Sequence, residues 1–171
     1  MKLRISGIVN DSIVDGPGIR LTVFTQGCLF NCPNCHNPQT HDLNGGYDQE
    51  ISEIMALIEN NSLLDGVTIS GGEPFLQPKA LLNLVKQIKP LSLSVMVYSG
   101  YTFEQIINDT TKRALLQEID YLVDGLFIEK LKSLELLYRG SSNQRLIDVQ
   151  TSLKANRVVE LNINEYGEII K

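Results

Sequence analysis

Short runs of apolar and β-branched residues alternate with amphipathic segments along the chain. Residues 2–9 predict a short strand, and residues 19–25, IRLTVFT, predict a second strand that ends at Gly27. In residues 48–60, apolar side chains recur at the spacing of one helix face. We therefore expect an amphipathic helix there, with Asp48 as its N-terminal cap.

The same alternation continues through the middle of the chain. A strand over 67–70 is followed by a predicted helix that begins near Pro78, where a missing N–H is harmless, and stops before Pro90. Thr102 and Gln105 fit the capping-box pattern at the start of a third helix, which extends to Leu115 and Leu116. The remaining predicted elements are strands over 93–98, 119–123 and 145–149, a short helix over 126–137 and a helical turn over 150–156.

This repeated strand–helix order favours parallel strands joined by right-handed crossovers. Too few units exist for a closed eight-stranded barrel, so we expect an α/β fold with an open partial (β/α) barrel and mostly parallel strands. No repeat or Pro/Ser-rich linker divides the sequence, which predicts a single domain over 1–171 with its core at about 5–153. The alternating segment within 156–171, VVELNINEYGEII, predicts an added strand or hairpin.

Charge and hydropathy exclude several classes of partner. The formal net charge of −5 gives no overall attraction to phosphate backbones, so we expect no nucleic-acid binding. No apolar run approaches 18 residues, and the first residues lack a signal-peptide core. We expect a cytoplasmic protein that does not bind membranes.

The cysteines point to one metal centre. All three lie within eight residues as Cys28, Cys32 and Cys35, in a segment whose Gly, Asn and Pro content predicts a loop. Three thiolates leave one iron of a [4Fe-4S] cluster without a protein ligand. The cysteines alone also allow a zinc-binding interaction domain, with His36 or His41 as the fourth ligand.

A glycine pair follows the strand predicted over 67–70. Gly71 and Gly72 permit a close backbone approach, and Glu73 adds a carboxylate that can accept a hydrogen bond from an ammonium group. Because α/β folds place ligand sites at the carboxyl ends of parallel strands, this turn and the cysteine loop are expected to open on the same side. By itself, a Gly-Gly turn after a strand is more often purely structural.

The two motifs together resemble the radical S-adenosylmethionine enzymes. CLFNCPNC is a C-x3-C-x2-C motif, and GGE follows the next strand. More narrowly, the chain resembles the activases of glycyl radical enzymes, those of anaerobic ribonucleotide reductase most of all. This resemblance covers about 5–153 and is carried by DGPGIR (15–20), FTQGC (24–28), CHNPQTHD (35–42), YSGYTFE (98–104) and RGSSNQRLIDV (139–149).

The resemblance implies a radical SAM oxidoreductase. Cys28, Cys32 and Cys35 would hold one [4Fe-4S] cluster, whose fourth iron binds the methionyl group of S-adenosyl-L-methionine (SAM). Reductive cleavage would yield a 5′-deoxyadenosyl radical that abstracts hydrogen from a glycine of the partner. The segment of Gly71, Gly72 and Glu73 would contact the methionyl amino end, and backbone around Asn34, Cys35 and His36 would lie near the adenine. No side-chain acid or base is required for this chemistry.

The family also implies partners. The protein substrate would be the large subunit of anaerobic ribonucleotide reductase, and a flavodoxin or ferredoxin would donate electrons. A pyruvate formate-lyase-type activase remains the alternative within the family. Many radical SAM enzymes have an aromatic residue before the third cysteine, where this chain has Asn34, so stacking on adenine is not expected there. Asp15, Arg20 and the SSNQR stretch at 141–145 allow partner docking, loop closure or plain turn and cap chemistry.

Overall fold

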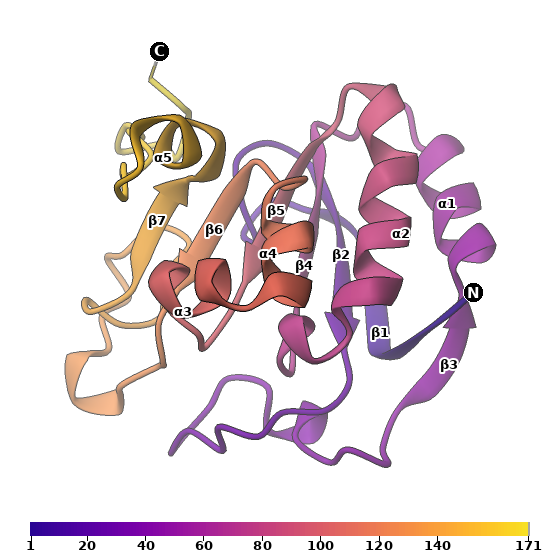
Figure 1. The fold of residues 1–171 in the computed structure, drawn as a ribbon, viewed down its shortest axis with the longest axis horizontal. Coiled ribbons are helices and arrows are strands. Elements are labelled where there is room, and N and C mark those ends of the chain that lie inside the picture. The colour runs from indigo at the N-terminus through magenta and orange to yellow at the C-terminus, as the bar shows by residue number, and fades with distance from the viewer. Residues whose placement is uncertain (171) are drawn as a thin grey trace.

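The chain folds around one seven-stranded sheet, which the computed structural model describes for residues 1–170 (Figure 1). Its strands, in the spatial order β3-β1-β2-β4-β5-β6-β7, are β1 (Lys2–Ser12), β2 (Arg20–Thr25), β3 (Tyr47–Glu50), β4 (Gly66–Gly71), β5 (Ser94–Tyr98), β6 (Tyr121–Asp124) and β7 (Arg145–Asp148). The central strands β2, β4, β5 and β6 are parallel. Antiparallel strands form both edges. The sheet is not closed, so the predicted open α/β architecture is confirmed.

Five helices in residues 1–170 follow strands of the sheet and contribute buried residues to the main core on one of its faces (Figure 1). They are α1 (Ile51–Glu59), α2 (Pro78–Ile88), α3 (Phe103–Asn108), α4 (Thr110–Leu116) and α5 (Val149–Ala155), with short 3-10 turns η1 (Pro38–Thr40), η2 (Pro74–Leu76), η3 (Lys89–Leu91) and η4 (Glu129–Leu131). Helix α2 begins at Pro78 as predicted. The capping box of α3 is also confirmed, because the Thr102 and Gln105 side chains each accept a hydrogen bond from the other residue's backbone N–H.

Three sequence predictions about the elements are wrong. Asp48 does not cap α1, because it lies in β3 opposite Arg4 of β1, and Glu50 occupies the cap position. The predicted third helix is two helices, because Asp109 interrupts it and its side chain caps α4. Residues 126–137 form no helix beyond the turn η4. None of its apolar side chains belongs to the buried core, and Leu126, Ile128, Leu131 and Leu134 are exposed, so no core contact stabilises a helix there.

The two faces of the sheet bury different residues. The main core lies under the helices and includes alternate residues of the central strands, such as Val23, Ile69 and Val97. On the opposite face, a smaller buried cluster of Met96, Val123 and Leu146 packs against three tyrosines and two residues of the C-terminal extension, namely Tyr98, Tyr121, Tyr138, Leu161 and Ile163. The extension therefore covers part of the inner face of the partial barrel.

The C-terminal extension continues the sheet beyond β7 only through short contacts. Its backbone forms one isolated bridge to β7, between Glu160 and Ile147, and a second within itself between Ile163 and Ile169. In place of the predicted extra strand or hairpin, the described part of this extension therefore has only two isolated bridges. In the part of the chain that the structure describes, no helix has the length and apolar character needed to cross a bilayer.

Parallel strands bring the two sequence motifs to the same edge of the sheet. The cysteine loop follows β2, and the GGEP turn follows its neighbour β4. The long loop after β6, residues 125–144, extends from the same edge (Figure 1). The site is therefore built from loops at the carboxyl ends of three parallel strands, the usual ligand position in α/β folds.

Candidate functional site

The cysteine loop is closed at its base by hydrogen bonds between its two ends. The Gly27 N–H donates to the Thr40 carbonyl oxygen over 2.8 Å, and the Cys28 N–H donates to the His41 carbonyl oxygen over 3.2 Å. The Gln26 side chain adds a bond of 2.7 Å to the Asp42 carbonyl oxygen. The sequence between these ends contains few strand or helix formers, so these closing bonds define the loop.

Two asparagines between the cysteines adopt left-handed backbone conformations. Asn31 has φ 48° and Asn34 has φ 53°, a region that asparagine tolerates better than most residues. Their turns wrap the loop so that Cys28, Cys32 and Cys35 all line one cavity. The three thiols are half-buried, and none of them forms a disulfide.

The thiols are close enough to influence one another. Burial raises the pKa of Cys28 and Cys32, and the charge of neighbouring cysteine thiolates raises it further. Among residues 1–170, however, no three His, Cys, Asp or Glu side chains converge on a position for a single metal ion.

The GGEP turn is bonded directly to the start of the cysteine loop. The Gly72 N–H donates to the Thr25 carbonyl oxygen over 2.9 Å, and the Glu73 N–H donates to the Gly27 carbonyl oxygen over 2.8 Å. A Cβ atom at Gly71 would overlap the backbone of Thr25, and one at Gly72 would overlap the Gly27 carbonyl. Both glycines are therefore required by this backbone contact, irrespective of any ligand.

The Glu73 carboxylate is buried and already holds three donors. Its oxygens accept bonds of 2.9 Å from the Phe75 N–H, 2.9 Å from the Ser99 hydroxyl and 2.8 Å from the Gly100 N–H. Burial raises the pKa of Glu73 to about 7, although these hydrogen bonds act in the opposite direction. Glu73 thus fixes the loop after β5 against the GGEP turn.

The cavity between these loops has a volume of about 410 Å³, within the range of small-molecule sites. Aromatic side chains line part of its wall: His36 packs against Phe127 with ring centroids 4.8 Å apart, and Phe30 is backed by Tyr101 at 4.7 Å, although Tyr101 does not line the cavity. The three cysteines and Gly71–Glu73 share this cavity. The structure thus brings together the two motifs that the sequence singled out.

The side chain of Asn34 is the exception among the predicted site residues. It points out of the cavity and donates a hydrogen bond of 2.5 Å to Glu129. Cys35 and His36 do line the cavity, and the Asn37 N–H bonds to the Cys35 sulfur over 3.4 Å. The aromatic surface at this end of the cavity is formed by His36 and Phe127 rather than by the residue before Cys35.

Arg20 has a structural role. It is fully buried, and all its hydrogen bonds go to hydroxyl and carbonyl oxygens of the inner sheet face, those of Thr68, Ser94, Pro17 and Val67. Burial lowers the pKa of Arg20 to about 10. Docking of a partner on this side chain is therefore ruled out. Asp15 lines the cavity, but its carboxylate already accepts hydrogen bonds from Ser12 and Thr22.

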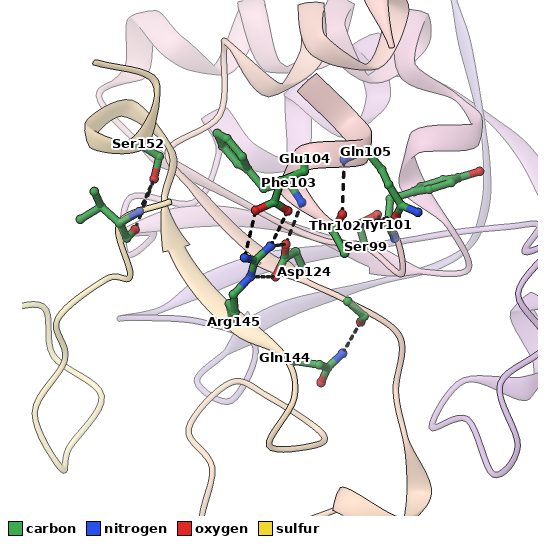
Figure 2. Close-up of polar contacts among 12 residues, drawn as sticks. Ser99, Tyr101, Thr102, Phe103, Glu104, Gln105, Asp124, Gln144, Arg145 and Ser152 are labelled. Carbon is green, nitrogen blue, oxygen red and sulfur yellow. Dashed lines mark hydrogen bonds and ion pairs between the residues drawn. The ribbon is translucent and has the colours of Figure 1, made fainter. Parts of the chain in front are cut away.

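The SSNQR stretch, residues 141–145, joins the loop after β6 to β7. The Gln144 amide donates to the Gly125 carbonyl oxygen over 2.9 Å, and Arg145 bridges Asp124 and Glu104 (Figure 2). Asn143 donates to the Leu126 carbonyl oxygen over 2.8 Å. These internal contacts agree with the turn chemistry that the sequence allowed.

Phe127, Tyr138 and Arg139 are among the cavity residues that were not identified from the sequence. Phe127 follows β6, so its place at the carboxyl end of a parallel strand was a usable signal. Arg139 opens the RGSSNQR segment, but its position beside the cavity depends on the irregular path of residues 125–140. Periodicity carries no information about such a path.

The donor set fits a [4Fe-4S] cluster with SAM beside it. Soft thiolates are the usual ligands of iron–sulfur clusters, and three on one loop leave one iron free for another ligand. The adjoining cavity offers backbone at the GGEP turn, an aromatic wall and one guanidinium. These are the groups needed to hold an amino-acid end and a nucleoside end of one molecule.

Comparison with known sequences places this architecture in a family. Residues 14–147 match the model of a 4Fe-4S single cluster domain. The chain is 37% identical to the anaerobic ribonucleoside-triphosphate reductase-activating protein of Vibrio cholerae, with 77% of this chain and 89% of the relative aligned. The protein of that name from Escherichia coli K12 is 34% identical, with 77% of this chain and 90% of the relative aligned.

Two further likenesses agree with this placement. The pyruvate formate-lyase-activating enzyme of Clostridium pasteurianum is 38% identical over 63% of this chain and 49% of its own length. Among solved structures, QueE from Escherichia coli superimposes with a TM-score of 0.51 at 13% identity, covering 76% of this chain and 74% of QueE. The second likeness concerns the fold alone.

Proposed function

The chain belongs to the radical SAM activases of glycyl radical enzymes, and from this premise we propose that it activates an anaerobic ribonucleoside-triphosphate reductase. The observation that carries the proposal is the direct bond between the two motifs, Glu73 N–H to Gly27 carbonyl, which holds the cysteine loop and the GGEP turn on one cavity. The relatives named for this activity align over most of their length.

In this proposal, Cys28, Cys32 and Cys35 ligate one [4Fe-4S] cluster through thiolates. SAM binds between the cluster and the GGEP turn, with its amino end at Gly71–Glu73 and its adenine near the backbone of Asn34, Cys35 and His36. When bound and reduced, the cluster supplies the electron for cleavage of SAM, which leads to hydrogen abstraction from a glycine of the partner. The protein itself positions these groups and excludes water from them.

The internal bonding of Glu73 refines its role in this scheme. Its carboxylate is fully buried and holds the Ser99 hydroxyl and the Gly100 N–H, so it fixes the cavity wall. Contact with the amino group of SAM then falls mainly to the backbone of the turn. A carboxylate already satisfied by three donors gains less from a fourth than a free one would.

The partner's glycine lies in a polypeptide, so it has to enter through the open side of the partial barrel. Val14, which lines the cavity, is an exposed apolar side chain. A pyruvate formate-lyase is the second candidate partner, supported by the likeness to the Clostridium pasteurianum enzyme over 63% of this chain. We also propose that a flavodoxin or ferredoxin donates the electrons. Residues 1–171 form a single domain in this proposal.

Anaerobic reconstitution tests the cluster and the cofactor together. The full chain should hold four irons and, with a strong reductant and SAM, release methionine and 5′-deoxyadenosine. Cys32→Ala should lose both properties, whereas Ser142→Ala, an exposed serine on the other side of the cavity wall, should keep them. Stoichiometric zinc without release of 5′-deoxyadenosine would overturn the proposal.

A further inference from the structure

Arg139 has a buried nitrogen without a hydrogen-bond partner. Its Nε is the one buried side-chain nitrogen or oxygen in residues 1–170 that lacks a partner. The guanidinium makes a single long contact, 3.4 Å from Nη1 to the Gln144 carbonyl oxygen. An unsatisfied buried donor costs about 1–3 kcal/mol, and more when it is charged. Such a group indicates an acceptor that comes from outside the chain.

The neighbouring acids do not supply that acceptor. Asp15 and Glu73 also line the cavity, yet the carboxylate of each already accepts hydrogen bonds from other residues, and neither forms an ion pair with Arg139. Arg139 is the one lysine or arginine among the lining residues. It is therefore the cationic group available to an anionic ligand in this cavity.

The backbone on both sides of Arg139 is fixed. The Tyr138 hydroxyl donates to the Gly167 carbonyl oxygen of the C-terminal extension over 3.0 Å. The Gly140 N–H donates to the Gln144 side chain over 2.8 Å, and Gly140 packs against the rings of His36 and Phe127. The backbone that carries Arg139 therefore loses little freedom when this residue binds a ligand.

From these contacts we propose that Arg139 binds the carboxylate of the methionyl group of SAM. This rests on the proposed function, because it assigns a residue to one part of that cofactor. A guanidinium pairs with a carboxylate through two parallel N–H···O bonds, and SAM carries one carboxylate and no phosphate. Arg139 lines the same cavity as the three cysteines, so the carboxylate can meet both the guanidinium and the cluster. Arg139 is thus a cofactor-binding residue.

The test compares two uncleavable ligands on the reconstituted full chain. S-adenosylhomocysteine carries the amino-acid group, whereas 5′-methylthioadenosine has the same adenosine thioether without it. By calorimetry, Arg139→Gln should weaken binding of S-adenosylhomocysteine about 10- to 100-fold and leave that of 5′-methylthioadenosine unchanged. Arg139→Lys should restore part of the loss, and the exposed Arg113→Gln should change neither affinity. The iron content should stay at four per chain in every variant.

Three results would overturn the inference. They are unchanged affinity for S-adenosylhomocysteine in Arg139→Gln, an equal loss of affinity for both ligands, and a loss of iron in that variant. Failure of the wild-type protein to bind S-adenosylhomocysteine would instead contradict the proposed function, and this assignment with it. Affinity is measured without turnover, so a defect in the electron supply does not affect the result.

Discussion

The backbone N–H of Glu73 donates a hydrogen bond of 2.8 Å to the carbonyl oxygen of Gly27. Through this bond the turn after β4 and the loop after β2 act as one unit at the edge of the sheet. The contact brings backbone to within hydrogen-bond distance of backbone, which explains why Gly72 beside it has no room for a side chain. The position of the three thiols relative to the GGEP turn depends on this close approach.

Gly72→Ala should therefore disturb the cysteine loop. The added methyl group would overlap the Gly27 carbonyl, and overpacking of this kind costs about 1–3 kcal/mol of unfolding free energy. We expect a lower urea midpoint and fewer than four irons per chain after anaerobic reconstitution. Gly7→Ala is the matched control, because no atom lies within 4 Å of the added Cβ. Equal behaviour of the two variants would contradict the role given to the contact.

The buried Glu73 should make stability depend on pH. Its pKa is raised to about 7 by burial, so the folded state holds the proton more tightly than the unfolded state, whose pKa is about 4.3. The stabilising effect is complete at low pH and is lost as pH rises through 7. Between pH 5 and pH 7, the cluster-free wild type should lose about 2 kcal/mol relative to Glu73→Gln. Urea unfolding at both pH values measures this, and parallel pH profiles would contradict the assignment.

Several parts of the fold were accessible from sequence because the signal is local. The capping box of Thr102 and Gln105 and the start of α2 at Pro78 both depend on backbone groups within one turn. Strand β3 was missed because its pairing with β1 joins residues more than 40 positions apart. No part of the segment 126–137 joins the buried core, and four of its apolar residues remain exposed, namely Leu126, Ile128, Leu131 and Leu134.

The functional site also has a part with a local sequence signal and a part that depends on contacts between distant residues. The cysteines and the GGEP turn were found because each motif is contiguous and follows a predicted strand. The role of Arg139 could not be assigned from sequence, because the evidence for it is a buried side-chain nitrogen that has no hydrogen-bond acceptor in the folded chain. The sequence left the role of Arg20 open, because a charged side chain is rarely buried without a carboxylate, and its oxygen partners come from two strands and a loop.

Arg145 should be important for stability rather than for chemistry. It pairs with the buried Asp124 and with the exposed Glu104, and Asp124 also accepts the Phe103 N–H over 2.7 Å (Figure 2). Arg145→Met would leave the Asp124 carboxylate buried without its cation, at a cost of about 3–5 kcal/mol. Glu104→Gln removes only the exposed ion pair with Arg145 and should lower the free energy of unfolding by less than about 1 kcal/mol. Urea unfolding separates the two, and similar costs would show that Asp124 does not depend on Arg145.

The C-terminal extension should contribute to the cavity wall through Tyr138. Tyr138→Phe removes the hydrogen bond to the Gly167 carbonyl oxygen and should cost about 1 kcal/mol. Limited proteolysis should then cut residues 162–170 faster than in the wild type. Tyr166→Phe is the control, because Tyr166 is exposed and its ring does not line the cavity. Unchanged cleavage in Tyr138→Phe would mean that the extension is held by its other contacts.

The central claim is that this chain makes a glycyl radical in a partner enzyme. The most direct measurement is electron paramagnetic resonance on the reconstituted, reduced protein mixed with SAM and either an anaerobic ribonucleoside-triphosphate reductase or a pyruvate formate-lyase. We predict a glycyl radical signal with the reductase that is absent when the activase carries Cys32→Ala. A signal with the lyase alone would show that the chain is a pyruvate formate-lyase-type activase. No signal with either partner, from protein that holds four irons and cleaves SAM, would contradict the account.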